Sequence, residues 1–259
     1  MISTVFMCAG RLSLTKMILL RYMDMMEYDN ELCLVYDGNS PSYVSELEKI
    51  CDFKHKVINW NGETQGHLLN VAHDKLNSPY YMFMENDWWW REKGCIEEAM
   101  YAIDKYEDVH IVRIVDLPYK KGDRMTRQLP NCKMGDIDPA HNMAFHFNPQ
   151  IRTVKYPAGR FLPTSNQTWP DLESAMFLKY GGFGSWVLLH PYFRHIGFFS
   201  SNGQPFMNNV YTLEDIYSAN FYGGTFSDLK LTKEYRELFN EYLLWGLDKI
   251  DEKKPRRRT

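Results

Sequence analysis

Short apolar runs alternate with longer amphipathic stretches through the first 115 residues of the chain. The apolar runs have the length and composition of buried strands, and they lie at residues 2–8, 31–36, 54–59, 80–84 and 109–115. The stretches between them carry apolar side chains at helical spacing, and they lie at residues 13–27, 41–50, 66–76 and 92–106. This alternation predicts an α/β fold with a mostly parallel sheet and crossover helices.

The pattern is less regular beyond residue 116. Residues 116–139 are polar and contain five Lys or Arg side chains, which is typical of a mobile loop over a site or of a plain connector. Further along, the pattern predicts strands at residues 143–147 and 186–189, helices at 171–180 and 231–250, and a solvated or disordered basic tail at 253–258. No internal repeat or Gly/Ser linker divides the chain, so we expect one compact domain.

Composition supports a globular protein and narrows its partners. With 259 residues, of which 44% are hydrophobic and 15% aromatic, the chain can bury a sizeable core. The formal net charge of -3 gives no overall basic field. Nucleic acid and anionic membranes are therefore not the expected partners, and any binding of a polyanion must be local.

The cysteines and the apolar segments indicate the compartment. Five cysteines are scattered and form no Cys-x-x-Cys pair, which indicates small core side chains in a reducing compartment rather than disulfides or a zinc site. Residues 1–10 are apolar but too short for a signal peptide, and no run approaches the roughly 18 residues that span a bilayer. We therefore expect a cytoplasmic protein without a transmembrane segment.

Acidic side chains follow two of the predicted strands directly. Asp37 follows the second strand, and Glu85-Asn86-Asp87 follows the most apolar strand of the chain. Ligands of open α/β sheets bind outside the carboxyl ends of the strands. Two carboxylates separated by one residue can offer oxygen ligands to Mg²⁺ or Mn²⁺ and leave positions for a diphosphate, although a surface turn with incidental acids has the same pattern.

Four segments together resemble the GT-A glycosyltransferases, in particular the inverting family 2-like enzymes and their compact viral or phage members. The segments occur in the family's order and at its approximate spacing, and they are MCAGR at residues 7–11, VYDGNS at 35–40, GHLLNVA at 66–72 and YYMFMENDW at 80–88. The resemblance implies a Rossmann-like sheet with helices on both faces. It implies a nucleotide-sugar-binding half at residues 1–116, an acceptor-binding half with a C-terminal helix at 117–250, and a basic tail at 251–259.

The resemblance also implies an activity, which is transfer of a sugar from a nucleoside diphosphate donor, most simply a UDP-sugar, to a hydroxyl group. The reaction would depend on Mn²⁺ or Mg²⁺ and proceed with inversion, although GT-A folds also support retention. The acceptor would be a glycan or glycoprotein. A hydroxymethylated base in DNA is less favoured, and if the protein is viral it would act in the host cytoplasm. The oligomeric state stays open.

Donor-binding roles follow from the same resemblance. Asp37 would hydrogen-bond the nucleobase and Arg11 would approach the nucleotide, since a carboxylate accepts a base N–H and Arg pairs with phosphate. His67 and Asn70 would line the donor pocket. For Arg11 and Asn70, a solvated side chain at a helix end is the simpler alternative.

The acidic motif would hold the cation. Asp87 would be the main ligand, and His195 would complete the metal site as a neutral imidazole, although a histidine between apolar residues is often part of a core. Glu85 and Asn86 are assigned to the nucleotide as well, with Glu85 reaching the metal through water or holding the ribose. Because Glu85 replaces the first Asp of the family's D-x-D motif, its direct ligation of the metal is open.

Catalytic and stacking residues are the last assignments. Glu173 and Asp171 open the helix predicted at residues 171–180, and either would deprotonate the attacking hydroxyl, with Glu173 preferred by the resemblance. Acids at this position also simply complement the helix dipole. Trp88 and Trp89 would stack on a sugar or base, while core packing is expected to bury Trp88 or Trp90.

Two other functions remain as alternatives. A sugar-phosphate nucleotidyltransferase shares the nucleotide-binding half but needs a Gly-rich phosphate loop with a basic residue after the first strand, where this chain has only Ala9-Gly10-Arg11. A non-catalytic sugar-nucleotide-binding protein would keep the fold without the reaction. The departure of Glu85 and Asn86 from D-x-D supports this second alternative.

Overall fold

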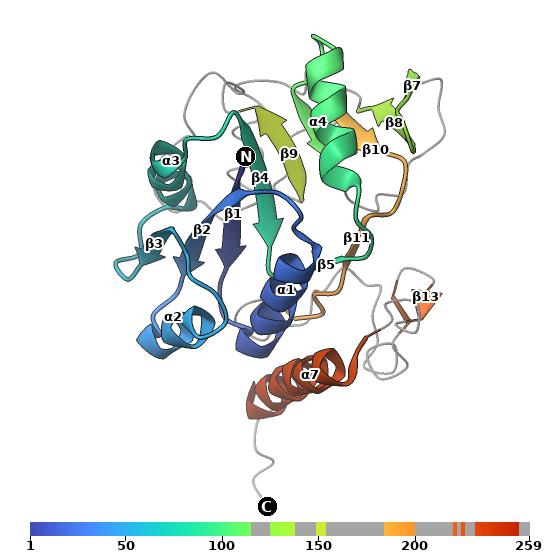
Figure 1. The fold of residues 1–259 in the computed structure, drawn as a ribbon. Coiled ribbons are helices and arrows are strands. Elements are labelled where there is room, and N and C mark those ends of the chain that lie inside the picture. Colours follow the sequence, from blue (N-terminus) through green and yellow to red (C-terminus); the bar gives the residue numbers. More distant parts are fainter. Residues whose placement is uncertain are drawn as a thin grey trace, which may run out of the picture.

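A mixed sheet forms the centre of the molecule, with helices packed on both faces (Figure 1). The computed structural model describes residues 1–114, 125–137, 149–153, 184–199, 220–221, 224–225 and 231–253. Within these residues the largest sheet has nine strands in the order β3-β2-β1-β4-β9-β6-β10-β8-β7. The prediction of an α/β fold is thereby confirmed.

Four parallel strands build the half of the sheet that positions the candidate site. They are β1 (Ile2–Cys8), β2 (Asn30–Asp37), β3 (His55–Asn59) and β4 (Tyr80–Glu85). β1 pairs with β2 and with β4, and β2 pairs with β3, all in parallel. The register places Met7 beside Glu85 and Asp37 beside Asn59. The residues that follow these four strands therefore meet at one edge of the sheet, termed here the carboxyl edge.

Helices cover both faces of these strands because successive strand residues point to opposite sides. On one face, Leu68 and Leu69 of α3 (Gln65–Lys75) share an apolar cluster with Val5 of β1. On the other face lie α1 (Leu12–Met25), α2 (Pro41–Glu48) and α4 (Cys95–Lys105), which join Phe6 in a larger cluster (Figure 1). This two-sided burial explains why the central strands are apolar throughout rather than alternating.

The remaining strands extend the same sheet. They are β6 (Ile111–Arg113), β7 (Thr126–Gln128), β8 (Lys133–Asp136), β9 (Gln150–Thr153) and β10 (Ser185–Leu188). β9 runs antiparallel to both β4 and β6, and β10 runs parallel to β6, so β6 and β10 point the same way as the first four strands. β7 and β8 form an antiparallel pair, and they are the last two strands of the sheet on the side away from β3.

The prediction that residues 116–139 form a loop or connector is wrong for the part that the structure describes. β7 and β8 occupy residues 126–128 and 133–136. These strands are short and polar, and their pairing comes from the neighbouring β10 rather than from a local apolar pattern. The strand predicted at 143–147 and the helix predicted at 171–180 lie outside the described residues.

The C-terminal part of the chain packs back on the first helix. α7 (Lys233–Lys253) lies against α1 (Figure 1). Two further strand pairs are small: β5 (Trp88–Trp90) pairs with β11 (Phe193–His195), and β12 (Asn220–Phe221) pairs with β13 (Gly224–Thr225). Among the described helices, none has the length and apolar character that crossing a membrane requires.

All five cysteines lie in the described part of the chain, and all are free thiols. Cys8, Cys33, Cys95 and Cys132 are buried, and Cys51 is partly buried. Burial raises the pKa of the Cys8 thiol to about 12. The prediction of small core side chains is confirmed for the four buried cysteines.

Candidate functional site

The turn after β1 has a backbone conformation that L-residues rarely adopt. Gly10 has φ of 53° and Arg11 has φ and ψ of 50°, so a non-glycine residue occupies the left-handed region. Arg11 also caps the start of α1, and its carbonyl oxygen accepts from the backbone N–H of Thr15 at 2.9 Å. Strained residues of this kind concentrate at functional sites. Here the left-handed turn places Arg11 at the carboxyl edge, beside the amino end of α1.

The Arg11 guanidinium binds the acidic motif directly. Nη1 donates to Asp87 Oδ2 at 2.8 Å and to the carbonyl oxygen of Phe199 at 3.2 Å, and Nη2 donates to Asn86 Oδ1 at 2.5 Å. The Arg11 and Asp87 side chains are each only 9% exposed. Within the described residues, the buried Arg11 Nε has no hydrogen-bond partner. The side chain therefore has one buried donor to spare beside a buried anion.

The Asp87 carboxyl is strongly biased towards its charged form. Burial by itself would raise its pKa, but the charges of Arg11 and His195 and their hydrogen bonds hold that pKa well below its usual range. The same ion pair raises the pKa of Arg11 against the opposing effect of burial. Asp87 is thus a buried carboxylate that the protein keeps ionised.

Pairing of β5 with β11 brings His195 to this carboxylate. His195 lies opposite Trp88 in the pair, and the backbone N–H of Ile196 donates to the carbonyl oxygen of Asp87 at 2.8 Å. His195 Nε2 lies 3.4 Å from Asp87 Oδ2. A Cβ added to Gly197 would lie 2.7 Å from the Asp87 Cβ, so only glycine leaves room for the carboxylate here.

Asp87 and His195 have a geometry that suits a divalent cation. Two ligand atoms 3.4 Å apart can contact one ion, since each metal–ligand bond is about 2.1 Å long. Among the residues whose positions are described, no group of three His, Cys, Asp or Glu side chains forms a ready metal site. Asp87 and His195 could therefore supply two protein ligands, and the metal-binding roles of Asp87, His195 and Glu85 stay predictions.

Glu85 and Asn86 have structural partners within the protein. Glu85 Oε2 accepts a hydrogen bond from Trp88 Nε1 at 3.1 Å. Asn86 is buried, and its side chain accepts from Arg11 and donates to Thr15 Oγ1 at 2.7 Å. Asn86 therefore orients Arg11, and the predicted contacts of Glu85 and Asn86 with nucleotide or metal stay predictions.

A second polar cluster lies at the carboxyl edge around Asp37. Asn59 Nδ2 donates to Asp37 Oδ1 at 3.0 Å and to the carbonyl oxygen of Glu63 at 2.9 Å. Trp60, which is 42% exposed, packs edge-on against Tyr36 at a centroid distance of 5.7 Å. Sequence reasoning missed Asn59 and Trp60, although Asn59 ends β3, Trp60 follows it, and the rule that selected Asp37 applies equally to them.

α3 places the two other predicted donor residues differently. His67 is in the first turn, at the carboxyl edge, where its exposed side chain lies 3.0 Å from the Glu63 carboxylate. Asn70 lies one turn later and is buried. Thr64 caps the helix by accepting from the backbone N–H of His67 at 3.3 Å. The donor-pocket roles of His67 and Asn70 stay predictions.

The three tryptophans after the acidic motif are buried, which confirms the expectation that core packing takes Trp88 or Trp90. Trp88 is 7% exposed and meets the ring of His195, at a centroid distance of 5.0 Å. Trp89 is 1% exposed and lies between the Arg21 guanidinium and the Tyr235 ring, each 5.0 Å away. The structure gives these rings core contacts, and stacking on a ligand stays a prediction. Glu173 and Asp171 lie outside the described residues.

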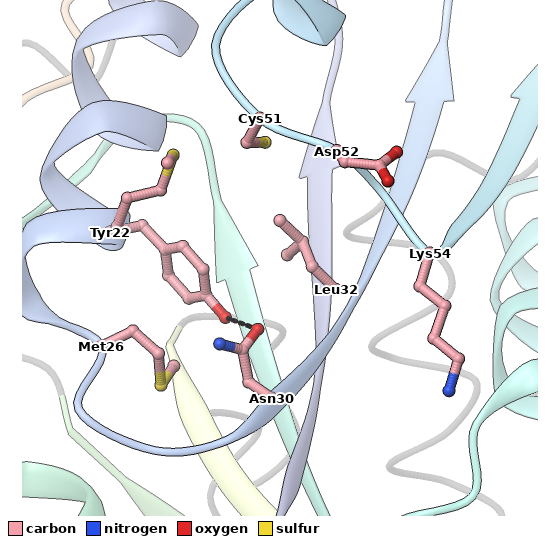
Figure 2. A pocket seen from close by; sticks show the side chains of 8 residues that line it. Tyr22, Met26, Asn30, Leu32, Cys51, Asp52 and Lys54 are labelled. Atoms are coloured by element: carbon pink, nitrogen blue, oxygen red, sulfur yellow. Dashed lines mark hydrogen bonds between the residues drawn. The ribbon is translucent and has the colours of Figure 1, made fainter.

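A pocket of about 400 Å³ lies at the amino ends of the parallel strands, termed here the amino edge (Figure 2). Its wall is formed by Tyr22, Met23, Met26, Asn30, Leu32, Cys51, Asp52 and Lys54. Tyr22 donates to Asn30 Oδ1 at 3.1 Å across this pocket. Because Asn30 begins β2, the pocket belongs to the amino ends of the strands and is separate from the candidate site.

Comparison with known proteins identifies the fold. Neither a protein-family model nor a curated protein sequence matches the chain. Residues 1–349 of TarS from S. aureus align with 98% of this chain and 73% of the TarS fragment, with a TM-score of 0.53 and 13% identity. The same fragment in complex with UDP-GlcNAc aligns over 96% and 82%, with a TM-score of 0.53 and 12% identity. The Mth528 nucleotidyl transferase from Methanothermobacter thermautotroptrophicus is more distant, with a TM-score of 0.44.

The likeness to TarS, at these identities, concerns the fold alone. Together with the strand order, it confirms the predicted α/β fold of GT-A type. The chain is thus a Rossmann-like protein whose carboxyl edge carries an Arg–Asp–His cluster, in which Arg11 and Asp87 are nearly buried and His195 is partly exposed.

Proposed function

We propose that this protein is a glycosyltransferase that takes a sugar from a nucleoside diphosphate donor, most simply a UDP-sugar, and transfers it to a hydroxyl group. The observation that carries the proposal is the meeting of Arg11, Asp87 and His195 at the carboxyl edge, beside the amino end of α1. Carboxyl edges of open α/β sheets bind ligands, and a helix amino end favours phosphate. The likeness to a fold solved with UDP-GlcNAc supports the choice of donor.

The diphosphate would lie between α1 and the Arg–Asp–His cluster. The backbone N–H groups that open α1 have no capping side chain, and the spare Nε of Arg11 provides a charged donor. Asp87 and His195 would hold Mn²⁺ or Mg²⁺, with Glu85 reaching the ion through water. When bound, such a cation neutralises charge on the departing diphosphate.

The nucleobase would bind at Asp37. Asn59 holds Asp37 Oδ1, which fixes the carboxylate and directs Oδ2 towards a base N–H. Trp60 offers an exposed ring at the same edge. His67 and Asn70 complete the donor side of this proposal.

The acceptor would approach from the second half of the chain. In a single displacement with inversion, Glu173 or Asp171 would remove the proton of the attacking hydroxyl as the bond to the diphosphate breaks. A glycan or glycoprotein is the favoured acceptor, and a hydroxymethylated base in DNA is a less favoured one. The acceptor-binding half at residues 117–250 belongs to the same proposal.

Release of nucleoside diphosphate from a panel of nucleotide sugars, with and without Mn²⁺, tests this function. We expect cation-dependent release from one donor, and a loss of at least about 100-fold in Asp87→Asn, because the carboxylate that fits the cation is removed. Asp52→Asn, at the opposite edge of the sheet, serves as the control and should retain full activity. Absence of any thermal shift with every nucleotide tested would contradict the proposal.

A parallel assay of pyrophosphate release, with a nucleoside triphosphate and a sugar phosphate as substrates, separates the proposed reaction from that of a sugar-phosphate nucleotidyltransferase. The basic residue in the turn after β1, Arg11, is the observation that keeps this second function open. A nucleotidyltransferase would release pyrophosphate from a nucleoside triphosphate and a sugar phosphate. Nucleotide-sugar binding without release of either product would instead indicate a non-catalytic binding protein.

A further inference from the structure

Arg11 occupies the carboxylate oxygen that a cation would need. Its Nη1 lies 2.8 Å from Asp87 Oδ2, the same oxygen that lies 3.4 Å from His195 Nε2. A guanidinium and a divalent cation at one buried oxygen repel each other, and the repulsion is strong because little water screens it. Full engagement of Asp87 by a cation therefore requires Arg11 to loosen its contact.

The Arg11 guanidinium also has contacts, and one unused donor, that do not involve Asp87. Its Nη2 is held by Asn86, its Nη1 also contacts the carbonyl oxygen of Phe199, and these contacts do not depend on Asp87. Its Nε is buried and has no hydrogen-bond partner among the described residues. A phosphate oxygen beside the amino end of α1 would satisfy this donor and supply a new anion for the guanidinium.

We propose that Arg11 is an internal counterion for Asp87 which a nucleoside diphosphate draws away, so that cation binding and diphosphate binding are coupled through Arg11. This inference rests on the proposed function. In the free protein the Arg11–Asp87 pair keeps a buried carboxylate neutralised and disfavours the cation. Arrival of the diphosphate exchanges one anionic partner of Arg11 for another, and Asp87 then becomes available. By reciprocity, each ligand strengthens the binding of the other.

Binding of Mn²⁺, followed by the electron paramagnetic resonance signal of the free ion, tests the proposal without any turnover. The titrations use the full chain with and without UDP, in wild type, Arg11→Gln, Arg21→Gln and Asp87→Asn. Arg21 is a matched control because it lies on α1, the helix that Arg11 caps, and donates to the backbone carbonyls of Trp90 and Arg91 instead of to Asp87.

We expect Arg11→Gln to bind Mn²⁺ about tenfold more tightly than wild type in the absence of UDP, because the competing cation is gone. The factor by which UDP tightens Mn²⁺ binding should shrink in this variant, leaving the part due to direct phosphate contact. Arg21→Gln should behave as wild type, and Asp87→Asn should bind Mn²⁺ poorly in all conditions. Arg11→Lys, which keeps the charge, should lie between wild type and Arg11→Gln.

Thermal unfolding provides a second measurement, since Arg11→Gln leaves a buried carboxylate without its guanidinium and should melt at a lower temperature. Mn²⁺ should raise that melting temperature more than it raises the wild-type value. If Arg11→Gln proves too unstable to titrate, Arg11→Met, which is also neutral, replaces it in the comparison with wild type.

Two results would overturn the inference, and they differ in what else they affect. Unchanged or weaker Mn²⁺ binding in Arg11→Gln, with binding still lost in Asp87→Asn, would show that Arg11 does not compete with the cation for Asp87. The proposed function would be unaffected by that result. No Mn²⁺ binding in wild type, even with UDP, would overturn both the inference and the cation's part in the proposed function.

Discussion

Three contacts hold Asp87, and they come from two parts of the chain that are distant in sequence. Arg11 lies in the turn after β1, His195 ends β11, and the backbone N–H of Ile196 binds the Asp87 carbonyl oxygen. Gly197 completes the surroundings by leaving space that a Cβ would fill. A small residue beside a functional carboxylate makes the position of that carboxylate sensitive to a single methyl group.

Gly197→Ala should displace the Asp87 carboxylate, because the new Cβ would lie 2.7 Å from the Asp87 Cβ and 2.8 Å from its Oδ2. We expect Mn²⁺ affinity and donor turnover to fall by about tenfold or more, since positioning errors near 1 Å weaken such sites strongly. Mn²⁺ titration and diphosphate release measure both effects.

Gly62→Ala is the control for this substitution. Gly62 has φ of 73° but nothing within 4 Å of the added Cβ, so its variant carries backbone strain without touching Asp87. Equal losses of Mn²⁺ binding in both alanine variants would show that general destabilisation, and not contact with Asp87, explains the result.

α7 supports the site without contributing a ligand contact of its own. The Tyr242 hydroxyl accepts from the backbone N–H groups of Phe198 at 2.7 Å and Phe199 at 2.8 Å. Gly246 lets the Phe199 ring lie against the helix, since an added Cβ would be 2.2 Å from that ring. The Phe199 carbonyl oxygen in turn accepts from Arg11. α7 thus holds in place the Phe199 carbonyl oxygen, which accepts a hydrogen bond from Arg11 in the turn after β1.

Tyr242→Phe should leave two buried backbone N–H groups without their acceptor. Each unsatisfied group costs about 1–3 kcal/mol, so urea unfolding should show a clear loss of stability. Because the Phe199 carbonyl is then less firmly held on Arg11, UDP binding should weaken further than the stability loss alone explains. Tyr235→Phe removes another α7 hydroxyl, which contacts Asp24, and provides the comparison. Equal effects of both substitutions on UDP binding would contradict the special role of Tyr242.

Elements with a strong local pattern were predicted well, and elements that depend on a neighbour were missed. β1 and the strand and helix runs around it carry apolar positions of regular period, so their existence follows from the sequence. β5 and β11 have three residues each and form by pairing with each other, so neither strand can be predicted from its own residues. The burial of Trp89 against Arg21 and Tyr235 depends on packing between elements, and the stacking of Trp88 or Trp89 on a ligand stays a prediction.

The two edges of the sheet have different charge arrangements in the whole molecule. The carboxyl edge holds the Arg–Asp–His cluster, whereas Glu31, at the start of β2, is buried at the amino edge. Burial would raise the pKa of Glu31, but hydrogen bonds from Lys54, His55, the backbone of Asn77 and Ser3 lower it to about 2. The lowered pKa means that the charged form of Glu31 stabilises the fold.

This contribution is fully present above the pKa of the unfolded chain, near 4.5, and is lost as the pH falls towards 2. Between pH 6 and pH 3, the wild type should lose roughly 2 kcal/mol more of its free energy of unfolding than Glu31→Gln, which cannot titrate there. Urea unfolding of both proteins at the two pH values measures the difference. Parallel losses in the two proteins would show that Glu31 does not carry this pH dependence.

The sequence by itself determined the α/β class, the central strands and the placement of Asp37, Glu85 and Asp87 after strands. These features follow from local periodicity and from the rule that parallel strands end at a common edge. His195 and Arg11 were selected through resemblance, and only the tertiary structure placed them on Asp87.

The structure alone decided what each side chain of the site contacts. Asn86 turned out to orient Arg11, and a backbone carbonyl, that of Phe199, became its third acceptor. Backbone groups carry no sequence signal, and contacts between distant segments depend on packing that no local pattern encodes. The acidic motif could therefore be read from the sequence, whereas the competition for its carboxylate became visible only in the fold.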